Sequence, residues 1–171
     1  MARLIPALTK FISVHPSTAG SDIQRLVVEK HSFPAAEPPA KSKVAFVWSH
    51  ANGFHKEILH PLMRRTLTQF RTLSRFHRTD FDFYAWDSRN HGDSARLNDG
   101  HVHIPTCNER IICSSKNGAN VLIDTWVDNA LDTIQVVDEM GLKENYDKLI
   151  GVGHSFGGSS MYVYRKDFAP R

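Results

Sequence analysis

The sequence has little cysteine, no long hydrophobic run and no strong excess of charge of one sign. Its two cysteines, Cys107 and Cys113, are too few for a disulfide scaffold and form no Cys-x-x-Cys pair, so we expect a reducing compartment. No apolar stretch approaches the about 20 residues of a membrane-spanning helix, so we expect no membrane span. With 21 basic and 18 acidic residues the net charge is only +3, which gives no indication of a nucleic-acid partner.

What is present is the composition of a globular protein. The chain has 171 residues, of which 41% are hydrophobic and 23% charged, as expected for one domain of ordinary size. We divide it into an N-terminal arm over residues 1–25 and a domain over residues 26–171, in which residues 101–124 form an irregular insert. The first 14 residues are basic and interrupted by Pro6, which favours a docking arm, with a transit peptide as the alternative.

Apolar patterning predicts strands that alternate with helices. Short apolar runs predict buried strands over residues 43–49, 81–86 and 147–153. The β-favouring residues Leu26, Val27 and Val28 predict a further strand over residues 23–33. Apolar residues at helical spacing predict helices over residues 57–73 and 126–140 and another from Phe156 onward, with Gly141 ending the second. This alternation indicates an α/β fold with a mostly parallel sheet and flanking helices.

A possible nucleophile lies between the last predicted strand and the last predicted helix. Gly153-His154-Ser155-Phe156-Gly157 fits the pattern G-x-S-x-G, which in a strand–turn–helix context indicates a nucleophile elbow. There the serine occupies a sharp, strained turn, and the glycines avoid collisions with it. We therefore predict that Ser155 is a nucleophile and that the backbone N–H of Phe156 is an oxyanion donor. The alternative is a glycine-rich turn that only links strand to helix.

Two further motifs follow predicted strands. His50-Ala51-Asn52-Gly53-Phe54 lies where α/β-hydrolases place the loop that supplies the second oxyanion N–H, which we assign to Phe54. Asp87–Ser94, with the sequence DSRNHGDS, resembles the Asp-x-Arg-Gly-His-Gly-x-Ser turn of these enzymes, with Asn90 in place of the usual glycine. The three motifs stand in the expected chain order. Together they identify a resemblance to the α/β-hydrolase superfamily.

Longer stretches narrow the resemblance. Four stretches of the chain resemble fungal α/β-hydrolases of secondary metabolism, in particular those of host-selective toxin biosynthesis. They are SHANGFHKEILHPLMRRTL, FDFYAWDSRNHGDSARLN, WVDNALDTIQVVDEMG and KLIGVGHSFGGSSM. This resemblance implies hydrolysis of an ester or acyl thioester, such as an acyl-CoA, in a pathway derived from polyketides or fatty acids. It implies a small-molecule acyl substrate and no cofactor or metal. We expect the arginines at residues 64, 65, 71, 75 and 78 to form a solvated helix face or, alternatively, a binding patch for an anionic partner such as CoA phosphates.

The resemblance also implies a location. Relatives of this kind act in peroxisomes by way of a C-terminal tripeptide. The sequence here ends in Ala169-Pro170-Arg171, which is not of the Ser-Lys-Leu type. We therefore keep two expectations, the peroxisome from the family and otherwise the cytoplasm.

The catalytic triad is incomplete. In α/β-hydrolases an acid and then a histidine follow the nucleophile, whereas residues 156–171 contain no histidine and one acid, Asp167, within the predicted helix. We expect the N-terminal portion of the fold, without its C-terminal strands, cap, triad acid and base. Two hypotheses follow. In the first, the chain is part of a serine hydrolase. In the second, it is a catalytically silent fragment or degenerate copy, which is at most an interaction partner of an intact relative.

The remaining histidines give weaker signals. His50 is a candidate substitute base, His91 is expected to brace its turn, and His154 should point away from Ser155. Two histidines and two cysteines lie close together in the sequence, at residues 101, 103, 107 and 113. Their spacing matches no known pattern of a zinc site, so we expect a polar loop there. Without a neighbouring strand, the apolar run Leu149–Val152 would be an exposed sheet edge, which predicts self-association.

Overall fold

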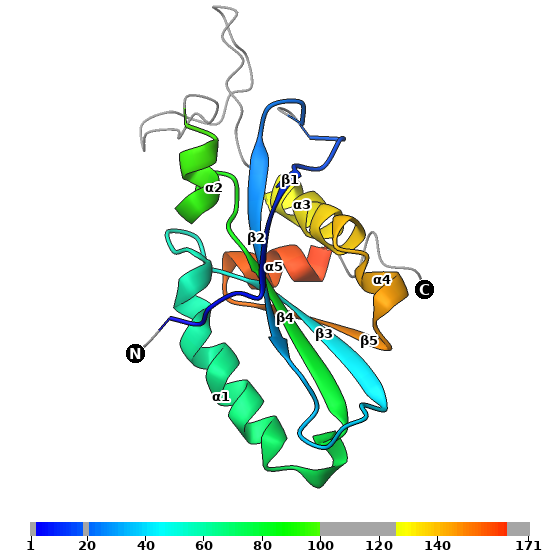
Figure 1. Ribbon diagram of the computed structural model, residues 1–171. Helices are drawn as coiled ribbons and strands as arrows, with labels where there is room; N and C mark the ends of the chain where they lie inside the picture. Colours follow the sequence, from blue (N-terminus) through cyan, green and yellow to red (C-terminus); the bar gives the residue numbers. More distant parts are fainter. Residues whose placement is uncertain (1–2, 19–20, 100–125, 164–171) are drawn as a thin grey trace, which may run out of the picture.

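The computed structural model describes residues 3–18, 21–99 and 126–163 (Figure 1). The insert expected over residues 101–124, with the histidine and cysteine group, and Asp167 lie outside the described residues. No helix among the described residues is both long and apolar enough to cross a bilayer.

Within the described residues, five strands form one mixed sheet in the order β1-β2-β4-β3-β5. Their bounds are Leu8–Ser13 for β1, Arg25–Phe33 for β2, Ser42–Ser49 for β3, Thr79–Trp86 for β4 and Lys148–Gly153 for β5. β3 is parallel to β4 and to β5, but β2 is antiparallel to β1 and β4. The sheet is therefore mixed rather than mostly parallel, because the arm and the strand after it run against the others.

The helices cover both faces of this sheet (Figure 1). The expected helix over residues 57–73 is a 3₁₀ turn, η1 (Lys56–Leu59), followed by α1 (His60–Arg71), and a second 3₁₀ turn, η2 (Ser74–Phe76), follows it. α3 (Trp126–Glu139) confirms the expected second helix, and Gly141 follows it with φ +59°. α5 (Phe156–Val163) follows β5, and the short helices α2 (Gly92–Leu97) and α4 (Leu142–Asn145) were not predicted.

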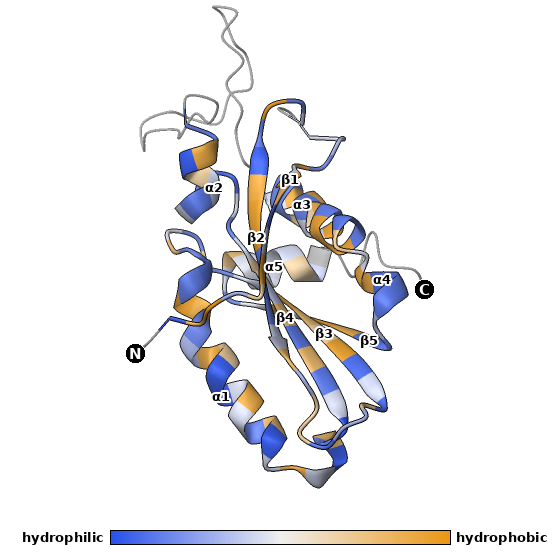
Figure 2. Ribbon diagram, viewed as in Figure 1, coloured by the Kyte–Doolittle hydropathy of each residue, from blue (hydrophilic) through white to orange (hydrophobic). Residues whose placement is uncertain are grey.

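Alternation along the central strands explains the two-sided core. In β3, Val44, Phe46 and Trp48 belong to the apolar cluster that packs on Met63 of α1. Ala45 and Val47 belong to the cluster on the opposite face, with α3 and α4. Figure 2 shows apolar residues along the strands and mixed surfaces on the helices. A strand buried on both faces reads as a continuous apolar run, so the three layers follow directly from the sequence.

Three strand ends lie side by side and position the site. Ser49, at the end of β3, is in register with Trp86 at the end of β4 and with Gly153 at the end of β5. These strands are parallel, so their carboxyl ends share one edge of the sheet. The loops that follow them contain the three sequence motifs. Open α/β sheets bind ligands at this edge.

Candidate active site

Ser155 occupies a strained turn between β5 and α5. Its φ is +51°, and no other non-glycine residue in the described part of the chain has a positive φ. L-residues avoid this left-handed region, and strain of this kind clusters at functional sites. The side chain is exposed. Ser155 thus lies on a sharp, strained turn between a strand and a helix, which is the geometry expected of a nucleophile elbow.

The glycines on either side of Ser155 allow the turn to sit against β3. A Cβ on Gly157 would meet the Ser49 carbonyl oxygen and lie 2.6 Å from the Ser49 carbonyl carbon and Oγ. A Cβ on Gly153 would overlap the backbone of Gly157 and Gly158. The His154 N–H also donates to the Ser49 carbonyl, at 3.1 Å. Both glycines of the motif are therefore required by close backbone approach.

The helix after the turn starts at Phe156. Its side chain is buried and makes an edge-to-face contact with Trp126, with ring centroids 5.5 Å apart. Its backbone N–H donates to no residue in the described ranges, as expected at the first turn of a helix. Ser160 ties this helix to α3 by accepting from Asn129 Nδ2 at 2.7 Å. An uncommitted N–H therefore lies one residue after Ser155.

The loop after β3 has three backbone N–H groups in different states. The Phe54 N–H, the predicted oxyanion donor, donates to the Ala51 carbonyl at 3.2 Å. The Gly53 N–H donates to His91 Nε2 at 2.9 Å. The Asn52 N–H has no partner within the described residues. Phe54 must therefore release a turn hydrogen bond before it can bind an oxyanion, whereas Asn52 need not.

His50 is buried and both of its ring nitrogens are engaged. Nδ1 donates to the Ala51 carbonyl at 2.8 Å, and Nε2 accepts from the Ser88 N–H at 3.1 Å. Burial lowers the pKa of His50, so the neutral ring is favoured. A base needs a free lone pair facing the proton it removes. His50 instead joins the loops after β3 and β4.

His91 forms a second link between these loops. Its Nε2 accepts from Gly53, and its ring lies 5.0 Å from that of His50. Burial, together with the neighbouring His50, lowers the pKa of His91 to about 4. The ring is therefore neutral near pH 7 and able to accept this hydrogen bond. Its side chain therefore braces the loop after β3 rather than its own turn, because its Nδ1 has no hydrogen-bond partner among the described residues.

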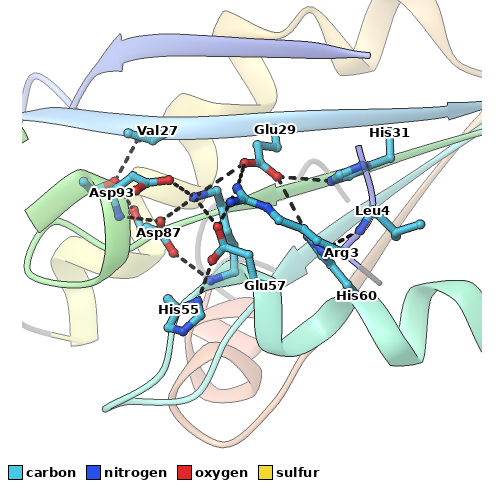
Figure 3. Close-up of polar contacts among 12 residues, drawn as sticks. Arg3, Leu4, Val27, Glu29, His31, His55, Glu57, His60, Asp87 and Asp93 are labelled. Carbon is cyan, nitrogen blue, oxygen red and sulfur yellow. Dashed lines mark hydrogen bonds and ion pairs between the residues drawn. The ribbon is translucent and has the colours of Figure 1, made fainter. Parts of the chain in front are cut away.

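A buried ion-pair network, which the sequence pattern does not indicate, lies beneath the same loops (Figure 3). Lys56 is fully buried. Its backbone N–H donates to Asp87 Oδ1 at 2.7 Å, and its Nζ donates to Asp87 Oδ2 at 2.8 Å. The same Nζ also donates to Asp93 Oδ2 at 2.6 Å. Burial opposes the charge of Lys56, but the bonds to Asp87 and Asp93 raise its pKa above the ordinary value. A lysine in a polar loop looks solvated in sequence, so only its partners show that it clamps two loops.

The arginine of the Asp-x-Arg turn anchors that turn to α3. Arg89 Nε and one terminal nitrogen donate to the two Asp132 oxygens at 2.6 and 2.7 Å, and both side chains are buried. Ser88 Oγ donates to Asn129 Oδ1 at 2.7 Å. Such a two-point guanidinium–carboxylate pair fixes orientation as well as distance. The motif residues thus have structural roles around the candidate site.

No protein-family model matches the sequence, and no curated protein matches it either. Several solved structures, however, are similar to this chain. The peroxisomal α/β-hydrolase Lpx1 of Saccharomyces cerevisiae superposes with a TM-score of 0.66 at 18% identity, over 96% of this chain and 41% of that protein. The chain has the α/β-hydrolase fold. A Pseudomonas aeruginosa protein proposed to be an epoxide hydrolase matches with a TM-score of 0.50 at 15% identity, over 98% of this chain and 40% of its own.

The α/β-hydrolase fold is present only in part. Because the chain spans 41% and 40% of the two matched structures, more than half of each has no counterpart here. The expected fold class is confirmed, as a partial α/β-hydrolase with a mixed sheet. Within that fold, Ser155, Phe156 and the loop His50–Phe54 lie at the carboxyl edge of the sheet.

Proposed function

We propose that the chain carries the nucleophile and oxyanion donors of a serine hydrolase that acts on an ester or an acyl thioester. The observation that carries this proposal is the exposed Ser155 at φ +51°, directly followed by the uncommitted Phe156 N–H. The second donor is a backbone N–H of the loop after β3, either Phe54 after loss of its turn hydrogen bond or Asn52 as it stands. Two convergent N–H groups stabilise a developing oxyanion.

The proposed reaction proceeds through an acyl-enzyme. Ser155 Oγ bonds to the acyl carbon and gives its proton to a base, while the carbonyl electrons move onto oxygen. Return of these electrons expels the alcohol or thiol, which takes the proton, and water then releases the acid by the same steps. Residues 156–171 contain no histidine, so in this proposal the base and triad acid belong to the remainder of a longer hydrolase.

The substrate class and location rest on the sequence resemblance. We propose an acyl-CoA-like substrate from a fungal pathway that makes polyketide- or fatty-acid-derived toxins, with the peroxisome as the location. The match to a peroxisomal yeast α/β-hydrolase supports the location. The cytoplasm remains the alternative location. The domain division, with an arm over residues 1–25 and a partial hydrolase domain over residues 26–171, is part of the same proposal.

A second proposal is that the chain is catalytically silent on its own. The histidines in the loops after β3 and β4 support this proposal, because neither offers a free nitrogen as a substitute base. Both ring nitrogens of His50 are engaged in hydrogen bonds, and His91 Nε2 accepts a hydrogen bond from the Gly53 N–H. Removal of triad members typically leaves only about 10³- to 10⁴-fold catalysis over water. Such a chain would act, at most, by binding an intact relative.

Labelling with a fluorophosphonate separates the two proposals. Because the base lies outside this chain in the proposal, we expect slow labelling of the folded chain at Ser155, promoted by the strained turn and its N–H groups. Ser155→Ala should lose the label, and Ser159→Ala, on the same helix, should keep it. Mass spectrometry of the intact protein measures the labelled fraction. A folded chain that takes up no label contradicts the hydrolase proposal for this chain and supports the silent one.

The free edge of β5 leads to a further prediction. Within the described residues β5 pairs on one side only, with β3, and Ile150 remains 38% exposed. Unprotected apolar edges invite pairing between chains. We expect the chain to self-associate in sedimentation velocity and Ile150→Lys to shift it toward monomer, whereas Phe11→Lys, on the opposite edge strand β1, leaves association unchanged. A monomeric parent chain would be the contrary result.

A further inference from the structure

The residues Arg3–Ile5 dock on a buried polar cluster away from the strand ends. We call Glu29, His31 and His60 the docking cluster; their side chains are 3%, 1% and 3% exposed. The Arg3 guanidinium lies 2.9 Å from Glu29 Oε1 and 2.8 Å from Glu57 Oε1. Figure 3 shows Arg3 reaching between these carboxylates. Its charge therefore holds the start of the arm against β2 and η1.

Two backbone contacts of the arm depend on where the ring protons lie. The Leu4 N–H donates to His60 Nδ1 at 3.1 Å. A backbone N–H can only donate, so His60 Nδ1 carries no proton and neutral His60 carries its proton on Nε2. The Ile5 carbonyl lies 3.4 Å from His31 Nδ1 and can only accept, so His31 Nδ1 carries a proton. The arm thus selects one protonation state of His60.

A metal site is the obvious alternative for this cluster. Glu29 Oε2, His31 Nε2 and His60 Nε2 lie within 4.8 Å of one another. Glu29 Oε2 is 3.4 Å from His31 Nε2 and 3.8 Å from His60 Nε2, but none of the three atoms has a partner with hydrogen-bond geometry in the described part of the chain. However, a histidine binds metal through an unprotonated nitrogen, and the Leu4 contact places the proton of His60 on Nε2. Arg3 and Lys56, whose Nζ is 3.6 Å from Glu29 Oε1, also bring positive charge. The geometry therefore favours a proton-dependent contact.

We propose that His60 is a pH-dependent latch for the N-terminal arm, which is docked while His60 is neutral and released when His60 is protonated. Protonation places a hydrogen on Nδ1, directly facing the Leu4 N–H. The hydrogen bond that His60 accepts from Leu4 is then replaced by two donors that face each other in a half-buried position, and leaving both donors without an acceptor is costly.

The charges around His60 decide the direction of its titration. Burial lowers the pKa of His60, and the neighbouring His31 and Arg3 lower it further, whereas Glu29 and Glu57 oppose them. The pKa in the docked state is thus below the ordinary value of 6.5. Docking is therefore favoured above that value and lost as the pH falls through the lowered pKa.

The latch is connected to the loops of the candidate active site. Lys56, which clamps Asp87 and Asp93, also lies 3.2 Å from Glu57. Arg3 shares Glu29 and Glu57 with this lysine. Release of the arm removes a positive charge from both carboxylates and leaves Lys56 as their main basic partner. Acidification therefore changes the charge balance under the loop after β3.

Hydrogen exchange of the Leu4 amide, corrected for intrinsic rates, tests the latch. We expect its protection to fall about ten-fold or more between about pH 7.5 and pH 4.5, while Phe83 in β4 stays protected. In His60→Gln the amide oxygen accepts from Leu4 and does not titrate, so protection should stay within about two-fold across this range. His77→Gln, which removes an imidazole elsewhere, should behave as the parent chain.

Three results would overturn the latch. They are protection of Leu4 that does not change with pH in the parent chain, protection that is lost equally in His60→Gln, and stoichiometric binding of Zn²⁺ near pH 7.5 that His60→Gln abolishes. If His60→Gln fails to fold, the ¹⁵N shifts of His60 in the parent chain serve instead. The latch requires the proton on Nε2 when docked and loss of Leu4 protection at the midpoint of the His60 titration.

Discussion

Gly157→Ala is expected to reduce the free energy of unfolding by about 3 kcal/mol or more, at the upper end of what overpacking a core position costs. The new Cβ would lie 2.6 Å from the Ser49 carbonyl carbon and Oγ, and both are held in the sheet. The elbow would have to move away from β3, which separates Ser155 from the loop after β3. Urea denaturation followed by tryptophan fluorescence measures the loss.

Gly158→Ala is the matched control. It adds the same methyl group one residue along α5, where the nearest atom, the Gly153 carbonyl oxygen, is 3.3 Å away. We expect a change of less than about 1 kcal/mol, because the gain in helix propensity opposes a mild contact. Equal effects of the two substitutions would mean that the elbow is not seated against β3.

Lys56→Met is expected to cost about 3–5 kcal/mol, as for removal of one partner from a buried ion pair. The substitution keeps most of the side-chain volume but leaves the buried Asp87 carboxylate without its lysine, which now donates to it at 2.8 Å. Thermal or urea unfolding measures this cost. Lys41→Met, at an exposed lysine, should change stability by less than about 0.5 kcal/mol.

The cost of Lys56→Met should depend on pH. The hydrogen bond from Lys56 lowers the pKa of Asp93 below its ordinary value of 3.8. Burial works against ionised Glu57, but the hydrogen bond from His55 and the charge of Lys56 lower its pKa to about 2. A carboxylate with a lowered pKa stabilises the fold above its ordinary pKa and loses this contribution as the pH falls. The difference between variant and parent should therefore shrink below about pH 4. A constant difference would contradict the assigned ion pairs.

Apolar patterning was sufficient to predict most of the fold. The runs that became β3 and β4 are short and continuous because alternate residues face different helical layers. The prediction that β5 is buried was wrong: none of its residues is buried, because it is an edge strand that pairs only with β3 among the described strands. β1 was missed because its segment, LTKFIS, carries only one buried residue, Ile12. Its strand character comes from pairing with β2 rather than from its own pattern. The six residues of α2 are too few for periodicity to indicate a helix.

Only the part of the candidate site that depends on neighbouring residues in the sequence could be predicted. G-x-S-x-G between a strand and a helix dictates a tight turn, so Ser155 and the need for Gly157 could be inferred. The state of the N–H groups at Asn52, Gly53 and Phe54 depends on a turn and on His91, 38 residues away. Likewise, no pattern links Lys56 to Asp87. Contacts between distant loops are set by tertiary packing, which one sequence does not reveal.

The central claim is that the folded elbow makes Ser155 the reactive centre. Its most direct test is to map the site of fluorophosphonate labelling by peptide mass spectrometry, in the native chain and in the chain unfolded by urea. We predict a label on Ser155 in the native chain that disappears on unfolding, because the reactivity depends on the strained turn and its N–H groups. A label that is equal in both states, or that lies on another serine, would contradict the account.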